Sequence, residues 1–226
     1  MSSPPVTLHR ADSGAANRVH ALHVELLTPH LWPRREDEFL GLAKEGRLIY
    51  AEQGDLFVGA CYVLDDEDND DPPEFGGVCV RANIQRNGLG YVLGAVAIGT
   101  YVASNMPRPD TKVIAHVHIR NDEKPRRLLE KLGFHFTRQV TVPPDLLPKD
   151  HRLDVEPDGS MKGDEYEYDF RKLAQLADRI HDVRGNGPFV MEPAAGPMGW
   201  PDILTAMREI AGGKRDLYTK PATRCA

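Results

Sequence analysis

The chain of 226 residues has few features of secreted, membrane or nucleic-acid-binding proteins. Its three cysteines, Cys61, Cys79 and Cys225, form no Cys-x-x-Cys pair, which predicts a reduced, cytoplasmic protein without a disulfide framework. No apolar run is long enough to span a membrane, and the first residues contain no signal-peptide pattern. The net charge of −6 argues against nucleic acid as the main partner, because phosphate backbones require a basic face.

What the sequence does contain is a polar turn with two glycines, between a predicted strand that ends at Val80 and a predicted apolar helix. The turn reads Gln85-Arg86-Asn87-Gly88-Leu89-Gly90-Tyr91. It lacks the third glycine of Gly-x-Gly-x-x-Gly, since the next glycine is Gly94, and it lacks the Lys-Ser/Thr of a nucleotide-binding phosphate loop. The first N–H groups of a helix have no intrahelical partner, and glycines let a phosphate approach them. The turn therefore predicts a cradle for a phosphate or pyrophosphate.

Hydrophobic periodicity predicts a mixed α/β domain with the order β-α-α-β-β-β-α-β-α-β-β. Strands are predicted over Val6–Arg10, Arg47–Gln53, Leu56–Leu64, Glu74–Val80, Lys112–Ile119, Phe134–Val142 and Glu165–Phe170. Helices are predicted over Ser13–Leu27, Arg35–Glu45, Tyr91–Ser104 and Glu123–Leu132. In the tail, Arg171–Val183 and Ile203–Ile210 have helical spacing. This tail could cover a substrate site, form the contact of a homodimer or dock on the core, and the sequence leaves the three open.

Two stretches and the order of elements between them resemble the GCN5-related N-acetyltransferases (GNAT). Residues 85–90 resemble the family's Gln/Arg-x-x-Gly-x-Gly/Ala signature, and Leu128-Leu129-Glu130-Lys131-Leu132-Gly133-Phe134 resembles its Leu-Tyr-x-Lys-x-Gly-Phe stretch. The resemblance covers residues 1–170 as an acetyltransferase domain and leaves 171–226 as a C-terminal helical extension. It implies a mixed central sheet whose fourth and fifth strands splay apart around the thioester arm of acetyl-CoA.

The same resemblance implies direct transfer of an acetyl group from acetyl-CoA to a primary amine in a ternary complex. The backbone N–H of Val80 or its neighbour would polarise the acetyl carbonyl, and the N–H groups from Gln85 to Tyr91 would bind the pyrophosphate. Arg86 would add a positive charge, with a solvated side chain as the alternative. Asn121 would bond the pantetheine arm or cap the following helix. A non-catalytic CoA-binding or protein-interaction module on the same fold is the rival interpretation.

Glu74 is the first candidate for the general base. It stands six residues before Val80, so simple alternation places it on the strand face of Gly76, Val78 and Val80. Histone-acetylating members of the family have their general-base glutamate at the same offset from the glycine signature. Gly76 and Gly77 are expected to leave room for a substrate. The alternative is that Glu74 only ends the acidic loop before it.

His116 and His118, which share one face of a predicted strand, are the alternative bases, since an unperturbed histidine titrates near neutral pH. They could equally be packed or solvated. Two histidines at i and i+2 without a convincing third ligand nearby predict no metal site.

The sequence departs from the family at Leu129, which replaces the tyrosine that protonates the leaving thiolate in many members. Acceptor specificity is expected from the loops Thr28–Glu36 and Pro143–Gly163. The acidic run from Asp65 to Asp71 would attract a cationic amine such as a lysine side chain, a polyamine or an aminosugar, or it is simply a solvated loop.

Overall fold

A computed structural model describes residues 4–65, 71–84, 88–105, 112–121, 123–149, 153–186, 189–191 and 200–211. These residues form one eight-stranded sheet of order β6-β7-β5-β4-β3-β2-β1-β8. Its strands are β1 (Val6–Arg10), β2 (Leu48–Gln53), β3 (Leu56–Leu64), β4 (Glu74–Val80), β5 (Ile114–His118), β6 (Phe134–Val142), β7 (Met161–Tyr168) and β8 (Phe189–Met191). Neighbours pair antiparallel except β4 with β5 and β1 with β8.

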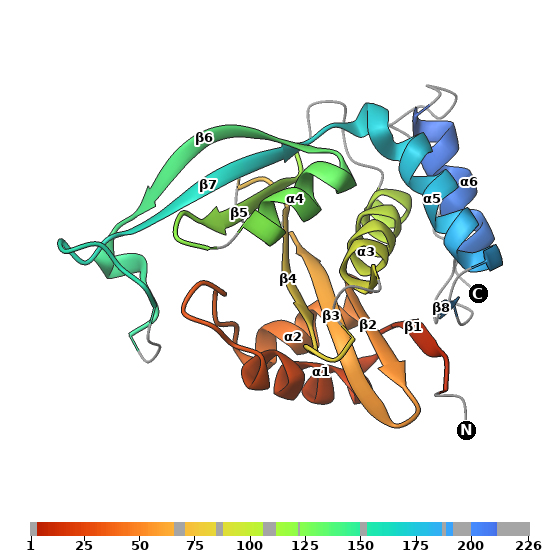
Figure 1. The fold of residues 1–226 in the computed structure, drawn as a ribbon, viewed down its shortest axis with the longest axis horizontal. Coiled ribbons are helices and arrows are strands. Elements are labelled where there is room, and N and C mark those ends of the chain that lie inside the picture. The colour runs from red at the N-terminus through yellow and green to blue at the C-terminus, as the bar shows by residue number, and fades with distance from the viewer. Residues whose placement is uncertain are drawn as a thin grey trace.

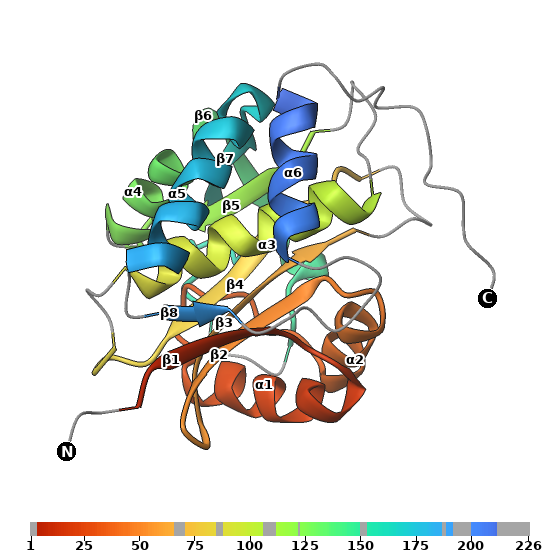
Figure 2. The same cartoon turned by 90° about the vertical axis from the view of Figure 1, so that its right-hand side faces the viewer.

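Helices cover both faces of the sheet (Figures 1 and 2). They are α1 (Ser13–Glu25), α2 (Glu36–Lys44), α3 (Leu89–Asn105), α4 (Glu123–Leu132), α5 (Leu173–Asn186) and α6 (Trp200–Ala211), with short 3₁₀ turns at Pro144–Leu146 and Phe170–Lys172. The lower core lies between the sheet and α1 and α2, and includes Val19, Phe39 and Tyr62. The upper core, on the other face, joins the sheet to α3, α4, α5 and α6. The central strands β2 and β3 are therefore covered from both sides, whereas β6 is largely exposed and β5 is exposed at His116.

The sequence predicts most of these elements to within one or two residues. One strand was wrong at both ends: β7 begins at Met161 rather than Glu165 and ends at Tyr168, because its first residues pair with Thr141 and Val142 of β6. The three-residue β8, which pairs with β1, was not predicted at all. No helix among the described residues is long and apolar enough to cross a membrane.

The described part of the C-terminal extension docks on the core. Leu173, Leu176, Ala177 and Ile180 of α5 are buried at the spacing that the sequence predicts, together with Met207 of α6. Both helices pack against α3 (Figure 2). The extension therefore continues the upper core.

A β-bulge divides β4 into two halves that face opposite ways. Ala60 of β3 pairs with Cys79 and Tyr62 pairs with Gly76, so two residues of β4, Gly77 and Val78, lie opposite one residue of β3. Gly77 has φ +63°, the left-handed conformation that glycine adopts without steric cost. Because the extra residue shifts the alternation, residues before the bulge and after it no longer follow one face pattern.

We expect Gly77→Ala to destabilise the fold by roughly 2–5 kcal/mol, the sum of a left-handed alanine and an overpacked contact. A Cβ at Gly77 would lie 2.0 Å from Cε1 of Tyr62. The measurement is the free energy of unfolding in urea. Gly41→Ala in α2 is the matched control, because nothing lies within 4 Å of a Cβ there, and it should stabilise the protein slightly. Equal stability of the two variants would contradict the bulge.

Candidate active site

The sheet opens between β4 and β5. Of the described residues of these two strands only Glu74 and Ile114 pair, supported by a 2.8 Å hydrogen bond from the Ile114 N–H to the Pro73 carbonyl. Beyond that point β5 turns away with β7, while β4 continues along β3 (Figure 1). The fourth and fifth strands thus splay as the family resemblance implies, and Glu74 stands where they part.

The N-terminus of α3 has the donors that an anion requires. Its first intrahelical hydrogen bond runs from the Val92 N–H to the Gly88 carbonyl at 3.1 Å, so the N–H groups of Leu89, Gly90 and Tyr91 precede the helical ladder. No acidic residue lies in this first turn. Gln85, Arg86 and Asn87 lie outside the described residues, so their predicted roles in the cradle stay predictions.

The two glycines of the cradle serve different purposes. Gly88 has φ +80°, and no atom of the described residues lies within 4 Å of a Cβ built there, so it is needed for its backbone conformation. A Cβ at Gly90 would point at Val78, Val80 and Leu128, at 3.7–3.8 Å. The missing side chain of Gly90 therefore leaves space between β4 and α4, beside the opening of the sheet.

The other predicted cosubstrate residues surround this opening. Val80 ends β4 and packs on the upper core, and the N–H of its neighbour Arg81 donates to the Val58 carbonyl at 2.9 Å. The backbone N–H of Arg81 is therefore already bonded, and it is not free to polarise the acetyl carbonyl. Asn121 lies in the turn between β5 and α4, where its carbonyl accepts a 2.9 Å hydrogen bond from Arg126. Leu129 is buried in the upper core, as an apolar residue at that position should be.

Glu74 and His116 form the centre of the candidate site. His116 Nδ1 lies 3.0 Å from Glu74 Oε1, and Arg34 Nη2 lies 3.2 Å from Glu74 Oε2. On its other side, His116 Nε2 lies 3.6 Å from Glu165 Oε2 on β7. The side chain of Glu74 is 29% exposed and that of His116 34%, so both are accessible to a small reactant.

The charges of this group perturb both pKa values. Desolvation raises the pKa of Glu74, but the hydrogen bond and charge of His116 and the Arg34 guanidinium outweigh it, and the net pKa is lowered. Desolvation lowers the pKa of His116, but Glu74 and Glu165 outweigh it, and the net pKa is raised. Glu74 is thus held as a carboxylate, and the carboxylates on either side of His116 favour its protonated form.

Arg34, which sequence reasoning missed, holds this centre to the loop between α1 and α2. Besides Glu74, its guanidinium bonds Glu38 Oε1 through Nη1 at 3.2 Å and the Tyr62 hydroxyl through Nε at 3.3 Å. Burial raises the pKa of Tyr62 to about 12, so the phenol remains neutral and accepts this bond. No local pattern could have identified Arg34, because its partners on β3 and β4 are distant in sequence.

Two sequence expectations about Glu74 are wrong, and the bulge explains both. Glu74 and Gly76 face the side of α1 and α2, whereas Val78 and Val80 pack on the upper core, so the four do not share one face. Gly76 and Gly77 leave no room for a substrate, because the ring of Tyr62 fills the space beside them.

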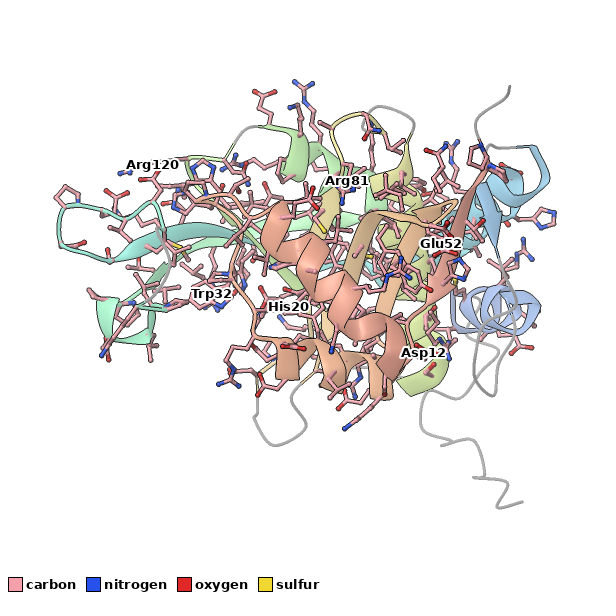
Figure 3. The ribbon with its side chains drawn as sticks, turned by 90° about the horizontal axis from the view of Figure 1, so that it is seen from below. Asp12, His20, Trp32, Glu52, Arg81 and Arg120 are labelled. Carbon is pink, nitrogen blue, oxygen red and sulfur yellow. The ribbon has the colours of Figure 1, made fainter. Side chains whose placement is uncertain are left out.

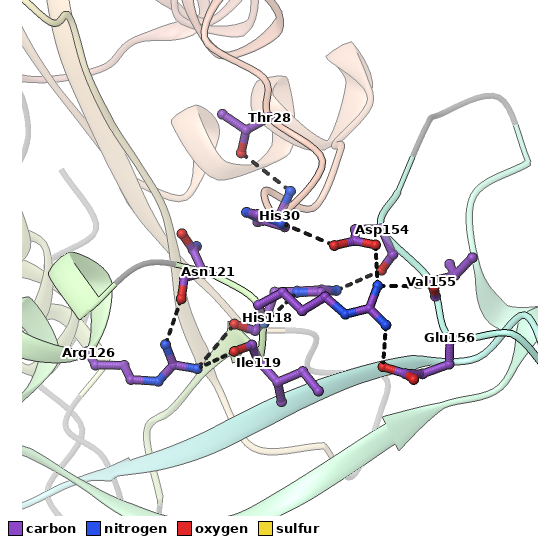
Figure 4. A network of polar contacts seen from close by, with 10 residues as sticks. Thr28, His30, His118, Ile119, Asn121, Arg126, Asp154, Val155 and Glu156 are labelled. Atoms are coloured by element: carbon purple, nitrogen blue, oxygen red, sulfur yellow. Dashed lines mark hydrogen bonds and ion pairs between the residues drawn. The ribbon is translucent and has the colours of Figure 1, made fainter.

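His118 belongs to a different group of contacts, shown in Figure 4. Its Nε2 donates to the Asp154 carbonyl at 2.7 Å, and its Nδ1 accepts from the Arg120 N–H at 3.1 Å. Arg120 also pairs with the Asp154 carboxylate, and His30 Nε2 lies 3.5 Å from that carboxylate. His30, His118 and Asp154 each place a potential metal-ligand atom within 4.8 Å of the other two. Both nitrogens of His118 are hydrogen-bonded within the protein, so we interpret the group as a clasp between loops.

The clasp joins the two loops that the sequence assigns to acceptor specificity. The Asp154 N–H donates to the Pro29 carbonyl at 3.2 Å, which ties the loop before β7 to the loop between α1 and α2. Trp32 lies in the latter loop, on the side facing the β6–β7 hairpin (Figure 3), and its carbonyl is 3.2 Å from His23 Nε2. In the acidic run, Asp65 contacts Arg47 and Tyr101, and residues 66–70 lie outside the described part of the chain.

No protein-family model and no curated protein matches the chain, but solved structures do. One is an acetyltransferase of the GNAT family from Streptococcus pneumoniae (TM-score 0.53, 15% identity, covering 73% of this chain and 99% of that one). Another is yncA from Salmonella typhimurium with its cofactor acetyl-CoA (TM-score 0.52, 20% identity, 72% and 92%). A third is diaminobutyrate acetyltransferase EctA from Paenibacillus lautus with L-2,4-diaminobutyric acid and coenzyme A (TM-score 0.50, 14% identity, 74% and 96%).

The fold is that of the GCN5-related N-acetyltransferases. This confirms the fold that the glycine turn and the residues 128–134 predict. The resemblance places the thioester arm of acetyl-CoA in the opening between β4 and β5. Glu74 and His116 lie at the start of that splay, on its lower face.

Proposed function

We propose that this protein is an acetyl-CoA-dependent N-acetyltransferase that acts on a primary amine by direct transfer in a ternary complex. The observation that carries the proposal is the single paired position between β4 and β5, with the Glu74–His116 pair beside it. The opening lies next to the cradle at the start of α3, since Gly90 faces Val78 and Val80 of β4. The GNAT fold supports the same function.

The residues at the start of α3 suit the pyrophosphate of CoA. Three successive N–H groups precede the helical ladder, the first turn has no carboxylate, and the helix dipole favours an anion there. When bound, acetyl-CoA supplies an activated acetyl thioester. We propose that Val80, Asn121 and the residues Gln85, Arg86, Asn87, Gly88, Leu89, Gly90 and Tyr91 bind it.

The chemistry requires that the amine lose a proton as its nitrogen bonds the acetyl carbon and the carbon–sulfur bond breaks. The products are an amide and the CoA thiol. A cationic amine loses two protons, one to become the nucleophile and one as the amide forms, of which one reaches the thiolate and the other is released to solvent. We assign the first task to the Glu74–His116 pair, which lies at the opening with an ionised carboxylate and a titrating imidazole.

The acceptor that suits this site is a cationic amine of a small molecule or of a protein. Three carboxylates meet there, those of Glu38, Glu74 and Glu165, against the two guanidinium groups of Arg34 and Arg138. With His116 neutral this group carries one net negative charge, which an arriving ammonium group would neutralise.

One observation favours a second candidate function, a CoA-binding module without catalysis. Leu129, buried in the upper core, stands where many GNAT proteins have the tyrosine that protonates the thiolate. In the enzyme, the thiolate would then take its proton from water or from His116.

Acetyl-CoA should bind at micromolar to millimolar concentration in calorimetry, and an amine should release free thiol from it in the presence of the protein. The panel should compare lysine peptides, polyamines and aminosugars with neutral alcohols as controls. Binding without thiol release from any amine would favour the non-catalytic module. No binding at millimolar acetyl-CoA would overturn both candidates.

A further inference from the structure

We propose that Arg34 is a positioning residue that fixes Glu74 as the orienting carboxylate of His116, so that Nε2 of His116 takes the proton from the amine. This inference rests on the proposed function, and it assigns separate roles to residues that the sequence offers only as alternatives. It follows from the hydrogen-bond partners of the two carboxylate oxygens of Glu74.

Both oxygens of Glu74 are occupied, each by a different side chain. Oε2 accepts from Arg34 at 3.2 Å, and Oε1 faces Nδ1 of His116 at 3.0 Å. An ionised carboxylate can only accept hydrogen bonds, so the proton of the imidazole lies on Nδ1. Neutral His116 therefore presents the lone pair of Nε2, as the imidazole of a carboxylate–histidine pair does.

The surroundings of Nε2 suit a proton acceptor. It lies 3.6 Å from Glu165 Oε2, which attracts the imidazolium once the proton has arrived. Glu165 is fixed by Arg138 at 3.0 Å through each of its oxygens and by the Thr137 hydroxyl. His118, on the same face of β5, is bonded at both ring nitrogens and cannot serve instead.

The guanidinium of Arg34 is held on three sides, by Glu74, Tyr62 and Glu38. Glu38 bonds Arg34 Nη1 with one oxygen and accepts from the Arg35 N–H at 2.7 Å with the other, in the capping box of α2. His20 Nε2 lies 3.2 Å from the Arg34 carbonyl. The side chain of Arg34 is 14% exposed. The charged groups around His116 among the described residues then form one alternating chain across five elements, Glu38, Arg34, Glu74, His116, Glu165 and Arg138.

The test is the pKa of His116, followed by NMR without substrate, and the pH profile of kcat/KM. Glu74→Gln removes the negative charge beside Nδ1, so the pKa and the acidic limb of the profile should move to lower pH while the limb persists. Arg34→Met removes a positive charge, so both should move to higher pH, and kcat on the alkaline plateau should fall about 10²-fold because Glu74 is no longer fixed. Arg34→Lys keeps the positive charge. It should return the acidic limb of the pH profile to its wild-type position but restore only part of kcat on the alkaline plateau.

Arg171→Met is the control, because it removes the same charge from a side chain that is 90% exposed and pairs with Asp169, away from Glu38, Glu74 and His116. This variant should leave the acidic limb of the pH profile and kcat on the alkaline plateau unchanged. Loss of the acidic limb in Glu74→Gln would make Glu74 the base and overturn the proposal, as would an unmoved His116 pKa in Arg34→Met. If the wild-type protein acetylates no amine, the proposed function fails, while the NMR titration still decides whether Arg34 and Glu74 control His116.

Discussion

His116→Gln is expected to lower kcat by roughly 10²–10⁴-fold, the usual contribution of a general base, and to abolish the acidic limb of the pH–rate profile. Glutamine can still accept or donate a hydrogen bond to Glu74, but it has no group that titrates near neutral pH. Since the side chain lies on the lower face of β5 and the cradle lies at the start of α3, affinity for acetyl-CoA should not change.

The control for this substitution is His135→Gln on β6, where the side chain is exposed. It removes a histidine from the same sheet without touching the site, so its kinetics should equal those of the wild type. Saturating amine and acetyl-CoA with free-thiol detection gives kcat, and the affinity comes from calorimetry. A full pH profile with an intact limb in His116→Gln would exclude His116 as the proton acceptor.

Gly90→Glu should weaken CoA binding by more than about 10²-fold, because a like charge held against an anion costs several kcal/mol. The carboxylate would sit in the first turn of α3, where the pyrophosphate is proposed to bind. The fold should tolerate it, since a Cβ at Gly90 meets Val78 at an ordinary 3.7 Å. An acidic residue in a first helical turn is also favourable for the helix, so the melting temperature should not fall.

Gly41→Glu is the matched control for Gly90→Glu. It makes the same chemical change in another helix, at a position where nothing lies within 4 Å of a Cβ. Its affinity for CoA should equal that of the wild type. If Gly90→Glu binds CoA normally while folded, the cradle at the start of α3 has been misassigned.

The order of elements could be predicted from the sequence because its signals are local. The apolar run Leu56–Leu64 after the Gly54-Asp55 turn signal, the Gly133 stop after α4 and the apolar run of α3 each depend on neighbouring residues, and each element was found. The strand β8 was missed because three residues carry no periodic pattern, and its pairing with β1 connects distant parts of the chain. The early start of β7 was missed for the same reason, since its register is set by β6.

The candidate site was only partly predictable. Glu74 and His116 were found as candidates, each for its own position in a strand, but their 3.0 Å contact across the splay and the role of Arg34 depend on tertiary structure. The two adjacent glycines of β4 were noticed and misinterpreted. They signal a bulge, which a single sequence does not distinguish from space left for a substrate.

The bulge in β4 has a consequence for which insertions and deletions the chain can accept. Side chains before it contact the lower face and those after it contact the upper core, so one residue more or less between Gly76 and Cys79 would exchange the faces of one half of the strand. Either the carboxylate of Glu74 would enter the upper core, or the side chains of Val78 and Val80 would leave it. An insertion or deletion in this segment should therefore cost the fold more than a substitution at most of its residues.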